Sequence, residues 1–271
     1  MKYKQNLHIH TVYGDGKNIP EEMIKTAVER GFDSIGFSEH SYNPWSPGRQ
    51  MTPEATECYK REIRQLKEKY RGTIDIFCGM EYEFVSEQET EDFDYLIGSV
   101  HYLEFDGQIC GFDRDLTKTL AYLQEHFGGN GLKFAEAYYE TVARLPEKKS
   151  FDIIGHFDLL TKNNEQGRFL DGSSKQYLDL GMEAIHALKG KIPLFEVNTG
   201  AISRGYRTAP YPQMEFLKEF RNCGFGVVLT SDCHNAEHID CFYPEAEALI
   251  REAGFRTHWI LTDSGFRETE L

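Results

Sequence analysis

The sequence lacks any long hydrophobic run. No apolar stretch among its 271 residues approaches the length of about 20 residues that a helix needs to cross a membrane. No apolar segment follows the first residues, Met1 to Gln5, as a signal peptide would require. The six cysteines form no Cys-x-x-Cys pair, which predicts free thiols in a reducing compartment. We therefore expect a cytoplasmic protein that does not bind membranes.

Positive charge is scarce as well. The chain has 30 lysine and arginine residues against 44 aspartate and glutamate residues, which gives a formal net charge of −14. No basic run concentrates positive charge locally, so the sequence argues against a nucleic-acid-binding surface. Part of the surplus negative charge would be neutralised if the protein binds several divalent cations.

The sequence also lacks internal repeats, low-complexity segments and any linker rich in proline or serine that would divide it. Hydrophobic residues make up 40% of the chain and include 19 Phe and 15 Tyr, which are enough to fill a sizeable core. The length is normal for a single α/β barrel. We therefore expect residues 1–271 to form one domain.

Short apolar segments alternate with amphipathic segments along the chain. The apolar segments have the length of buried strands, and the segments between them have helical periodicity. Strands are expected at residues 3–10, 34–38, 74–80, 96–100, 151–155, 193–197 and 227–231, with a short one at 258–261. Helices are expected from about residue 20 and over 53–70, 116–127, 132–145, 175–188, 212–222 and 244–253. A hairpin with Asp106-Gly107 in its turn should follow residue 101.

This alternation predicts the α/β class. Parallel strands with crossover helices fit a distorted seven-stranded βα barrel of the TIM type, in which functional residues lie at the carboxyl ends of the strands. A doubly wound open sheet is the alternative. We favour the barrel because His, Asp or Glu ends strand after strand, and an open sheet would not gather seven strand ends around one point.

Two histidines in the first expected strand have the spacing of a metal site. Side chains alternate along an extended strand, so His8 and His10 project from the same face. Two neutral imidazoles suit a borderline metal such as zinc, manganese or iron. Asp15 follows in a Gly-Asp-Gly turn that could fold its carboxylate over them. Taken alone, such a pair is more often a surface feature or a satisfied core pair than a pair of ligands.

Six further candidate ligands end the later strands. They are His40, Glu81, His101, His156, Asp232 and His234. With His8, His10 and Asp15 they exceed what one metal ion needs. The pattern therefore indicates a multinuclear metal site.

The order of these motifs resembles that of the PHP (polymerase and histidinol phosphatase) family. The motifs are His8-Ile9-His10, Glu39-His40, Gly79-Met80-Glu81, Ser99-Val100-His101, Gly155-His156 and Ser231-Asp232-Cys233-His234. Within the family the chain is most similar to the stand-alone histidinol-phosphate phosphatases. That similarity lies in His101-Tyr102 with its hairpin, in Gly155-His156-Phe157-Asp158 and in Glu196-Val197-Asn198-Thr199. The resemblance implies a distorted seven-stranded barrel with a trinuclear site.

The resemblance also implies a ligand set for each of three divalent ions, which would be Zn, Mn or Fe. Carried over by position, His8, His10, Glu81 and Asp232 would hold the first ion. Glu81 would bridge to a second ion that His101 and His156 complete. The third ion would take Asp15, His40 and His234. Many relatives have a histidine where Asp15 stands, so this chain departs from the pattern there.

The activity that the resemblance implies is hydrolysis of L-histidinol phosphate, a step of histidine biosynthesis. Two ions about 3.5–4 Å apart can share a hydroxide that attacks phosphorus in line, and the third would hold a phosphate oxygen. Asp232, Glu81 and His234 are the expected catalytic residues. Either Asp232 or a metal-bound water could protonate the leaving alkoxide.

Substrate-binding residues are expected on the loops after the strands. Arg168, Arg204 and Arg207 carry guanidinium groups that fit a phosphate, although any one of them could be an ordinary solvated arginine. We rank Arg168 and Arg204 above Arg207. The amine and imidazole of the substrate would suit acidic residues at the rim, namely Glu83, Glu104, Asp106, Asp113 and Asp158.

Two other functions fit the sequence less well. A PHP phosphoesterase could act on another small phosphate ester or on a nucleotide, but the net charge of −14 weighs against nucleic acid. The domain could instead be a non-catalytic, metal-stabilised binding module. Such a module should have lost ligands, and none of the nine candidate positions carries an apolar residue.

Overall fold

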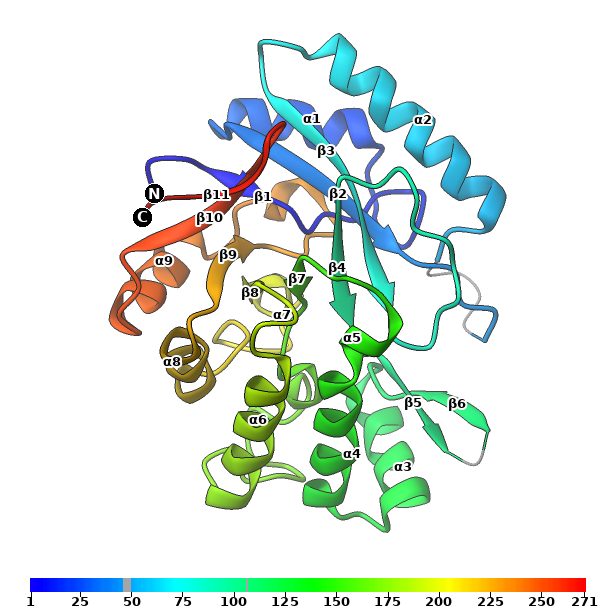
Figure 1. Cartoon of the computed structure of the whole chain (residues 1–271). Coiled ribbons are helices and arrows are strands. Elements are labelled where there is room, and N and C mark those ends of the chain that lie inside the picture. The colour runs from blue at the N-terminus through cyan, green and yellow to red at the C-terminus, as the bar shows by residue number, and fades with distance from the viewer. Residues whose placement is uncertain (46–49, 106) are drawn as a thin grey trace.

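The computed structural model describes residues 1–45, 50–105 and 107–271. Seven parallel strands form one sheet in the order β1-β2-β3-β4-β7-β8-β9 (Figure 1). Their bounds are β1 (Gln5–Asn6), β2 (Ser34–His40), β3 (Asp75–Glu83), β4 (Tyr95–Ser99), β7 (Ile153–Ile154), β8 (Leu194–Asn198) and β9 (Gly226–Thr230). Each strand pairs in parallel with the next in this order, as crossover connections require.

The two outer strands of this sheet approach each other and nearly close a barrel. Beyond the end of β1, Ile9 forms a parallel bridge to Cys233, and the backbone N–H of His10 donates to the Cys233 carbonyl at 3.0 Å. The barrel is distorted because β1 and β7 have only two residues each. The prediction of a seven-stranded βα barrel is confirmed, and the open-sheet alternative is wrong.

Helices cover the outside of the strands (Figure 1). Their bounds are α1 (Pro20–Glu29), α2 (Pro53–Lys69), α3 (Leu116–Phe127), α4 (Gly131–Ala143), α5 (Leu145–Lys148), α6 (Lys175–Leu188), α7 (Gly200–Ser203), α8 (Met214–Cys223) and α9 (Tyr243–Glu252). Side chains of Thr52, Asp115, Asn130 and Ser174 accept backbone N–H groups at the starts of α2, α3, α4 and α6. These caps explain why the expected boundaries agree so closely with the observed ones, whereas the single-turn α5 and α7 were not expected.

The inside of the barrel, below the strand ends, is filled by apolar side chains from nearly every strand. Leu7, Phe77, Tyr95, Ile97, Ile153, Leu194, Val228 and Leu261 form this cluster. The Tyr95 hydroxyl donates to the carbonyls of Leu7 and Phe37, at 2.5 and 3.0 Å. A side chain at Gly36 or Gly79 would overlap the Tyr95 ring, which is why glycine occupies both positions. The polar site therefore has a packed apolar floor.

Two antiparallel hairpins accompany the barrel. β5 (Tyr102–Phe105) pairs with β6 (Gln108–Gly111) directly after His101, which confirms the expected hairpin, although Asp106 of its turn lies outside the described residues. β10 (Thr257–Thr262) pairs with β11 (Gly265–Glu270), and the latter was not expected because its residues are mostly polar. Gln5 of β1 bonds the backbone of Leu261 and ties this second hairpin to the barrel. In the described part of the chain, no helix combines the length and apolar character needed to cross a bilayer.

Candidate metal centre

The nine ligands expected from the sequence meet at the carboxyl ends of the barrel strands. His8, His10 and Asp15 follow β1, His40 ends β2, and Glu81 lies near the end of β3. The other four follow β4, β7 and β9. Parallel strands point the same way, so their ends converge on one opening. The opening leads into a cavity of about 410 Å3, lined among others by Asp15, His40, Glu81, His101, His156, Asp232 and His234. His8 and His10 lie fully buried beneath it.

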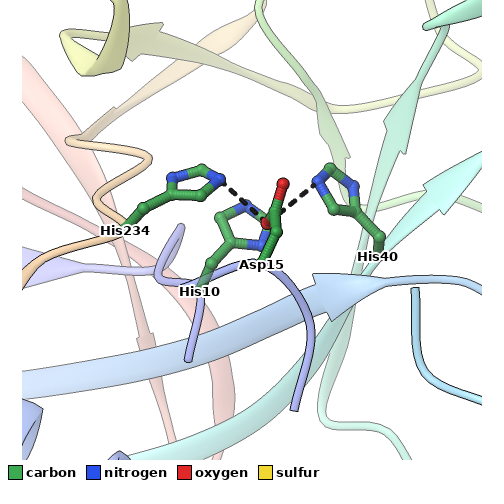
Figure 2. A group of neighbouring side chains, drawn as sticks. All are labelled: His10, Asp15, His40 and His234. Atoms are coloured by element: carbon green, nitrogen blue, oxygen red, sulfur yellow. Dashed lines mark ion pairs between the residues drawn. The ribbon is translucent and has the colours of Figure 1, made fainter. Parts of the chain in front are cut away.

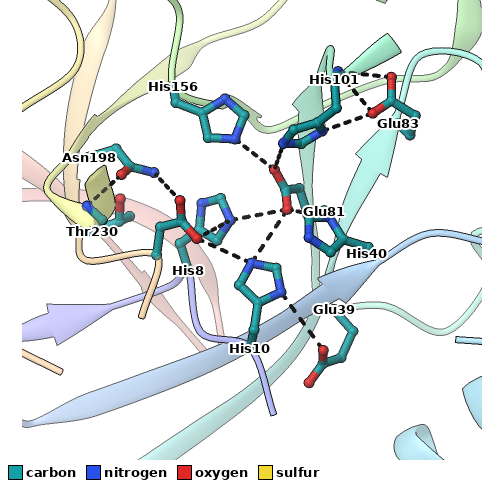
Figure 3. A network of polar contacts seen from close by, with 12 residues as sticks. His8, His10, Glu39, His40, Glu81, Glu83, His101, His156, Asn198 and Thr230 are labelled. Carbon is teal, nitrogen blue, oxygen red and sulfur yellow. Dashed lines mark hydrogen bonds and ion pairs between the residues drawn. The ribbon is translucent and has the colours of Figure 1, made fainter. Parts of the chain in front are cut away.

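The carboxylate of Glu81 lies at the middle of this cluster (Figure 3). Its Oε1 is 2.8 Å from Nε2 of His156 and 3.5 Å from Nε2 of His101. Its Oε2 is 2.8 Å from Nδ1 of His40 and about equally far, 3.4 and 3.5 Å, from Nε2 of His8 and His10. The two oxygens therefore face two different sets of imidazoles, as a carboxylate that bridges two ions must do.

Asp15 lies at a second focus of the cluster (Figure 2). Its Oδ1 is 3.0 Å from Nε2 of His234 and 3.7 Å from Nε2 of His40. The His10 ring lies between those two imidazoles, with ring centroids 4.5 Å from His40 and 4.3 Å from His234. The aspartate thus reaches the place that a metal ligand would need.

Two buried imidazole nitrogens of the cluster are left for a metal ion. Nε2 of His8 and Nε2 of His10 are buried without a hydrogen-bond partner among the described residues. Four overlapping groups of side chains could each hold an ion. They are His10 with Asp15, His40 and His234, then His8 with Glu81 and His156, His8 with His10 and Asp232, and His40 with Glu81 and His101. The donors are imidazole nitrogens and carboxylate oxygens, which suit zinc, manganese or iron.

The charges of the cluster point to the same conclusion. Burial alone would lower the pKa of His8, but the carboxylates of Glu196, Glu81 and Asp232 raise it well above its ordinary value. The pKa of His10 is likewise raised, to about 10, by Asp232 and Glu39 against the effect of burial. Buried carboxylates in this number require positive charge beside them, and divalent cations can supply it.

Asp232 has a strained backbone as well as a central position. Its φ angle is +43°, in the left-handed region that residues with a side chain seldom adopt. Arg204 holds it there: Nη2 donates to Oδ2 at 2.9 Å and Nη1 donates to its backbone carbonyl at 2.9 Å. Burial raises the pKa of Asp232, but Arg204 and His8 outweigh this effect and leave the pKa well below its ordinary value. The group is therefore an ionised carboxylate.

The three arginines expected to bind phosphate lie in different places. Arg204 lines the cavity and contacts Nδ1 of His234 at 2.8 Å in addition to Asp232. Arg168 is exposed, bonds the nearby Gln166 and does not line the cavity. The Arg207 side chain is nearly buried, where it contacts Asp158 and stacks over the Tyr211 ring, and it does not line the cavity. The structure thus brings only Arg204 to the site, and the expected phosphate contacts of Arg168 and Arg207 do not fit their positions.

Asp106 lies outside the described residues; of the four expected rim acids that the structure describes, only Asp113 lines the cavity. Its Oδ1 pairs with Nζ of Lys162 at 2.5 Å, and both side chains are nearly buried. Glu104 is exposed on β5, and Asp158 is buried in contact with Arg207 and the backbone N–H of Gln213. Lys162 also lines the cavity, where its Nζ lies 4.5 Å from the centre of the Tyr206 ring. Lys162 was not expected at the site, because nothing in the polar loop that carries it distinguishes it from a solvated lysine.

Comparison with known proteins agrees with this geometry. The model of the PHP domain matches residues 6–200, which is more than half of the chain and contains seven of the nine clustered ligands. The chain belongs to the PHP domain family. A protein of Schizosaccharomyces pombe named "Probable histidinol-phosphatase" is 27% identical over 255 residues, which cover 86% of this chain and 81% of that protein. The "Histidinol-phosphatase" of Bacillus subtilis is 27% identical over 265 residues, covering 89% and 97%.

A solved structure shares the fold of this PHP domain. It is the histidinol phosphate phosphatase of Lactococcus lactis, described as complexed with zinc, L-histidinol and phosphate. It superposes with a TM-score of 0.74 at 21% identity, over 97% of this chain and 98% of the Lactococcus chain. The superposition confirms the barrel expected from the sequence.

Carboxylates stand behind three histidines of the PHP centre. Nδ1 of His8 is 2.8 Å from Oε2 of Glu196, and Nδ1 of His101 is 2.8 Å from Oε2 of Glu83. Donation of the Nδ1 proton to such a carboxylate leaves the Nε2 lone pair free to face a metal. Glu39 lies 3.8 Å from Nδ1 of His10 and binds Thr11 more closely.

The positions of these three glutamates beside the histidines were not expected from the sequence. Glu83 was expected to contact the substrate, but it is buried, accepts the backbone N–H of His101 and lies behind that ligand instead of lining the main cavity. Glu196 and Glu39 were quoted only as parts of motifs and given no role. The signal that could have found Glu196 is a single acidic residue in the otherwise apolar strand β8, because a buried carboxylate needs a partner.

Substitution of Glu83 should test this supporting role. In Glu83→Gln the amide can donate to Nδ1 of His101, which favours the tautomer whose Nε2 carries a proton and cannot bind metal. We expect metal affinity or kcat/KM to fall by about 10–100-fold. Glu104→Gln, on the exposed face of β5, is the matched control and should change neither quantity. Wild-type metal content and kinetics in Glu83→Gln would show that the contact is unimportant.

Proposed function

We propose that this PHP domain is a histidinol-phosphatase, which hydrolyses L-histidinol phosphate to L-histidinol and phosphate. The observation that carries the proposal is the cluster of nine imidazoles and carboxylates beneath a cavity of about 410 Å3. The relatives named histidinol-phosphatase support it, because they align with most of the chain and are covered over 81% and 97% of their own lengths. The function is therefore a phosphomonoesterase activity that depends on metal.

The residues that would hold the metal are the nine clustered ligands. Three divalent ions of zinc, manganese or iron fit them best, with Glu81 shared between two ions and Asp15, His40 and His234 around the third. His10 is also near enough to Asp15 to join that third group. When bound, the ions supply Lewis acidity, which offsets the charge on the phosphoryl oxygens and lowers the pKa of water.

The cations of the cavity would position the phosphate. Arg204 and Lys162 both line it, and each is already oriented by a carboxylate, Asp232 for the arginine and Asp113 for the lysine. A guanidinium can donate two parallel hydrogen bonds to a phosphate, which fixes the orientation of the ester for in-line attack. Among the described residues that line the cavity, Asp113 is the one carboxylate outside the nine clustered ligands, so we assign it to the substrate's ammonium group, which it would bind beside Lys162.

Asp232 is the residue of this chain that would move the proton. Its carboxylate lines the cavity and is ionised, because Arg204 and His8 hold its pKa well below the ordinary value. It would accept a proton from the attacking water as the new P–O bond forms. It would then return this proton to the histidinol oxygen as the ester P–O bond breaks. The reaction consumes one water and leaves Asp232 in its starting state.

Substrate preference provides the test of the proposal. A site that pairs its polar groups with an amine and an imidazole leaves those groups unpaired when another ester binds. We expect kcat/KM for L-histidinol phosphate to exceed that for p-nitrophenyl phosphate and for nucleoside monophosphates by at least about 100-fold. This should hold even though nitrophenolate is the better leaving group.

The measurement is phosphate release by metal-replete protein with a panel of phosphate esters. Faster hydrolysis of a nucleotide or of a generic ester would refute the substrate assignment and favour another PHP phosphoesterase activity. Absence of phosphate release from every ester, with the metals bound, would instead favour a non-catalytic binding module.

A further inference from the structure

A second cluster of metal-binding side chains lies on the outside of the barrel, between α6 and α8. It consists of His186 from α6 with Glu219 and Cys223 from α8, and one ligand atom of each lies within 4.8 Å of the others. None of the three residues belongs to the cluster of nine or lines its cavity. The function derived above leaves them unused.

Packing of the two helices holds these side chains together. Phe216 of α8 lies against Gly181 of α6, where an added Cβ would come within 2.3 Å of its ring, and it contacts the Tyr177 ring edge-on. Such a close approach is possible only because residue 181 has no side chain. Glu219 follows Phe216 by three residues and Cys223 follows Glu219 by four, so both project from nearly the same face of α8.

The distances within this cluster suit a tetrahedral ion. Sγ of Cys223 is 3.6 Å from Oε1 of Glu219. In a tetrahedral zinc site the Zn–S bond is about 2.3 Å and the Zn–O bond about 2.0–2.2 Å, which places the sulfur and the oxygen about 3.6 Å apart. Nε2 of His186 is 2.7 Å from the same oxygen. A nitrogen and an oxygen bound to one tetrahedral zinc ion lie further apart than this, so the imidazole would move away from Oε1 by about 0.6 Å when the ion binds. His186 can do so, because 58% of its side chain is exposed.

The second oxygen of Glu219 already has a different partner. The amide of Asn222 donates to Oε2 at 3.4 Å, which leaves Oε1 directed at both the histidine and the thiol. Cys223 also lines a surface cavity of about 300 Å3 at the amino-terminal ends of β8 and β9. An ion and the water molecule that would complete its coordination can therefore reach the sulfur from solvent.

We propose that His186, Glu219 and Cys223 form a zinc site that joins α6 to α8, separate from the catalytic metal centre. One nitrogen, one oxygen and one sulfur donor from the chain are a donor set typical of zinc, and a water molecule takes the fourth position. The thiol loses its proton to solvent when the ion binds. The thiolate and the Glu219 carboxylate then balance the charge of the divalent ion.

Cobalt can distinguish this site from the catalytic one, since only this site has sulfur among its ligands. Zinc has no visible spectrum, whereas cobalt bound to a thiolate gives a sulfur-to-metal charge-transfer band in the near ultraviolet. We expect the full-length wild-type protein, titrated with Co2+, to develop this band. The band should disappear in Cys223→Ser, with one metal equivalent fewer than the wild type. In His186→Ala the cobalt affinity should fall, so that a higher Co2+ concentration is needed to develop the band.

Two controls keep the result interpretable. Cys110→Ser removes a half-buried cysteine of β6 that belongs to none of the potential metal groups, and it should leave the band unchanged. Phosphatase activity should be unaltered in Cys223→Ser, because the site is remote from the cavity. As a measurement that needs no variant, zinc should slow alkylation of Cys223 in the wild-type protein, as read by peptide mapping. No charge-transfer band in the wild type, or a band that persists in Cys223→Ser, would overturn the proposal.

Discussion

Replacement of Glu81 by alanine should remove most of the metal and nearly all of the activity. The two oxygens of this carboxylate face five imidazoles, those of His156 and His101 on one side and those of His40, His8 and His10 on the other. In the proposed trinuclear arrangement, its loss would remove one ligand from each of two ions. It would also leave the buried imidazoles without the negative charge that faces them. Loss of a residue that only hydrogen-bonds a metal ligand typically lowers activity by up to about 100-fold. We expect kcat/KM of Glu81→Ala to fall by more than that.

Asp15→Ala is the matched comparison, because Asp15 contacts only one of the expected ions. Elemental analysis of protein purified without chelator should find more than two equivalents of metal in the wild type. Two equivalents should be lost in Glu81→Ala but only one in Asp15→Ala. Circular dichroism should verify that both variants are folded. If both retained full metal content and rate, or if the wild type held a single equivalent, the trinuclear assignment would be wrong.

Much of the fold could be predicted because its local signals agree with the tertiary structure. Buried parallel strands read as short apolar runs, and capping residues such as Thr52 and Ser174 mark helix starts. The first strand is an exception: it was expected over residues 3–10, but only Gln5–Asn6 pair regularly. The Asn6 side chain accepts the backbone N–H groups of His8 and Ser231 and takes the place of a strand partner. Such a contact between distant residues has no local signal.

The convergence of the nine candidate ligands was predictable for a geometric reason. Parallel strands end at one face, so a His or a carboxylate at each strand end is sufficient to place them together. The groups behind them were not predictable, since the contact of Glu196 with His8 joins residues 188 positions apart. Lys162 was missed for the same reason, because its partner Asp113 comes from another loop.

The loop arginines show where sequence position misleads. Arg168 follows a strand end, yet its loop folds back on itself through Asn164, whose amide donates to the Leu170 carbonyl at 2.7 Å and whose Oδ1 accepts the N–H of Phe169. This closed loop leaves Arg168 at the surface. Arg207 lies only three residues beyond Arg204, but the chain turns after Gly205, whose φ angle is +74°. The two guanidinium groups therefore point to different surroundings.

Replacement of Arg204 by alanine should strongly impair turnover of the phosphate ester. Arg204 is the one arginine of the three that lines the cavity, and a preorganised donor aimed at charge that develops in the transition state contributes about 10²–10³-fold to kcat. We expect a loss of that order in kcat/KM. Inhibition by inorganic phosphate should weaken in parallel, because the product carries the group that the guanidinium binds. Arg168→Ala removes an equal charge at the surface and should behave like the wild type.

Arg204 also holds Asp232 and contacts His234, so its loss could act by releasing metal instead of phosphate. Metal content separates the two effects. If Arg204→Ala keeps wild-type metal content but shows a raised KM and weaker phosphate inhibition, Arg204 binds phosphate. If the variant loses metal while the remaining metal-loaded sites are inhibited by phosphate as in the wild type, Arg204 positions Asp232. Arg204→Lys sharpens the distinction: a lysine keeps the charge but cannot make the paired donation to Asp232 or to a phosphate. Near-wild-type kinetics in both Arg204 variants would reject the phosphate-binding role.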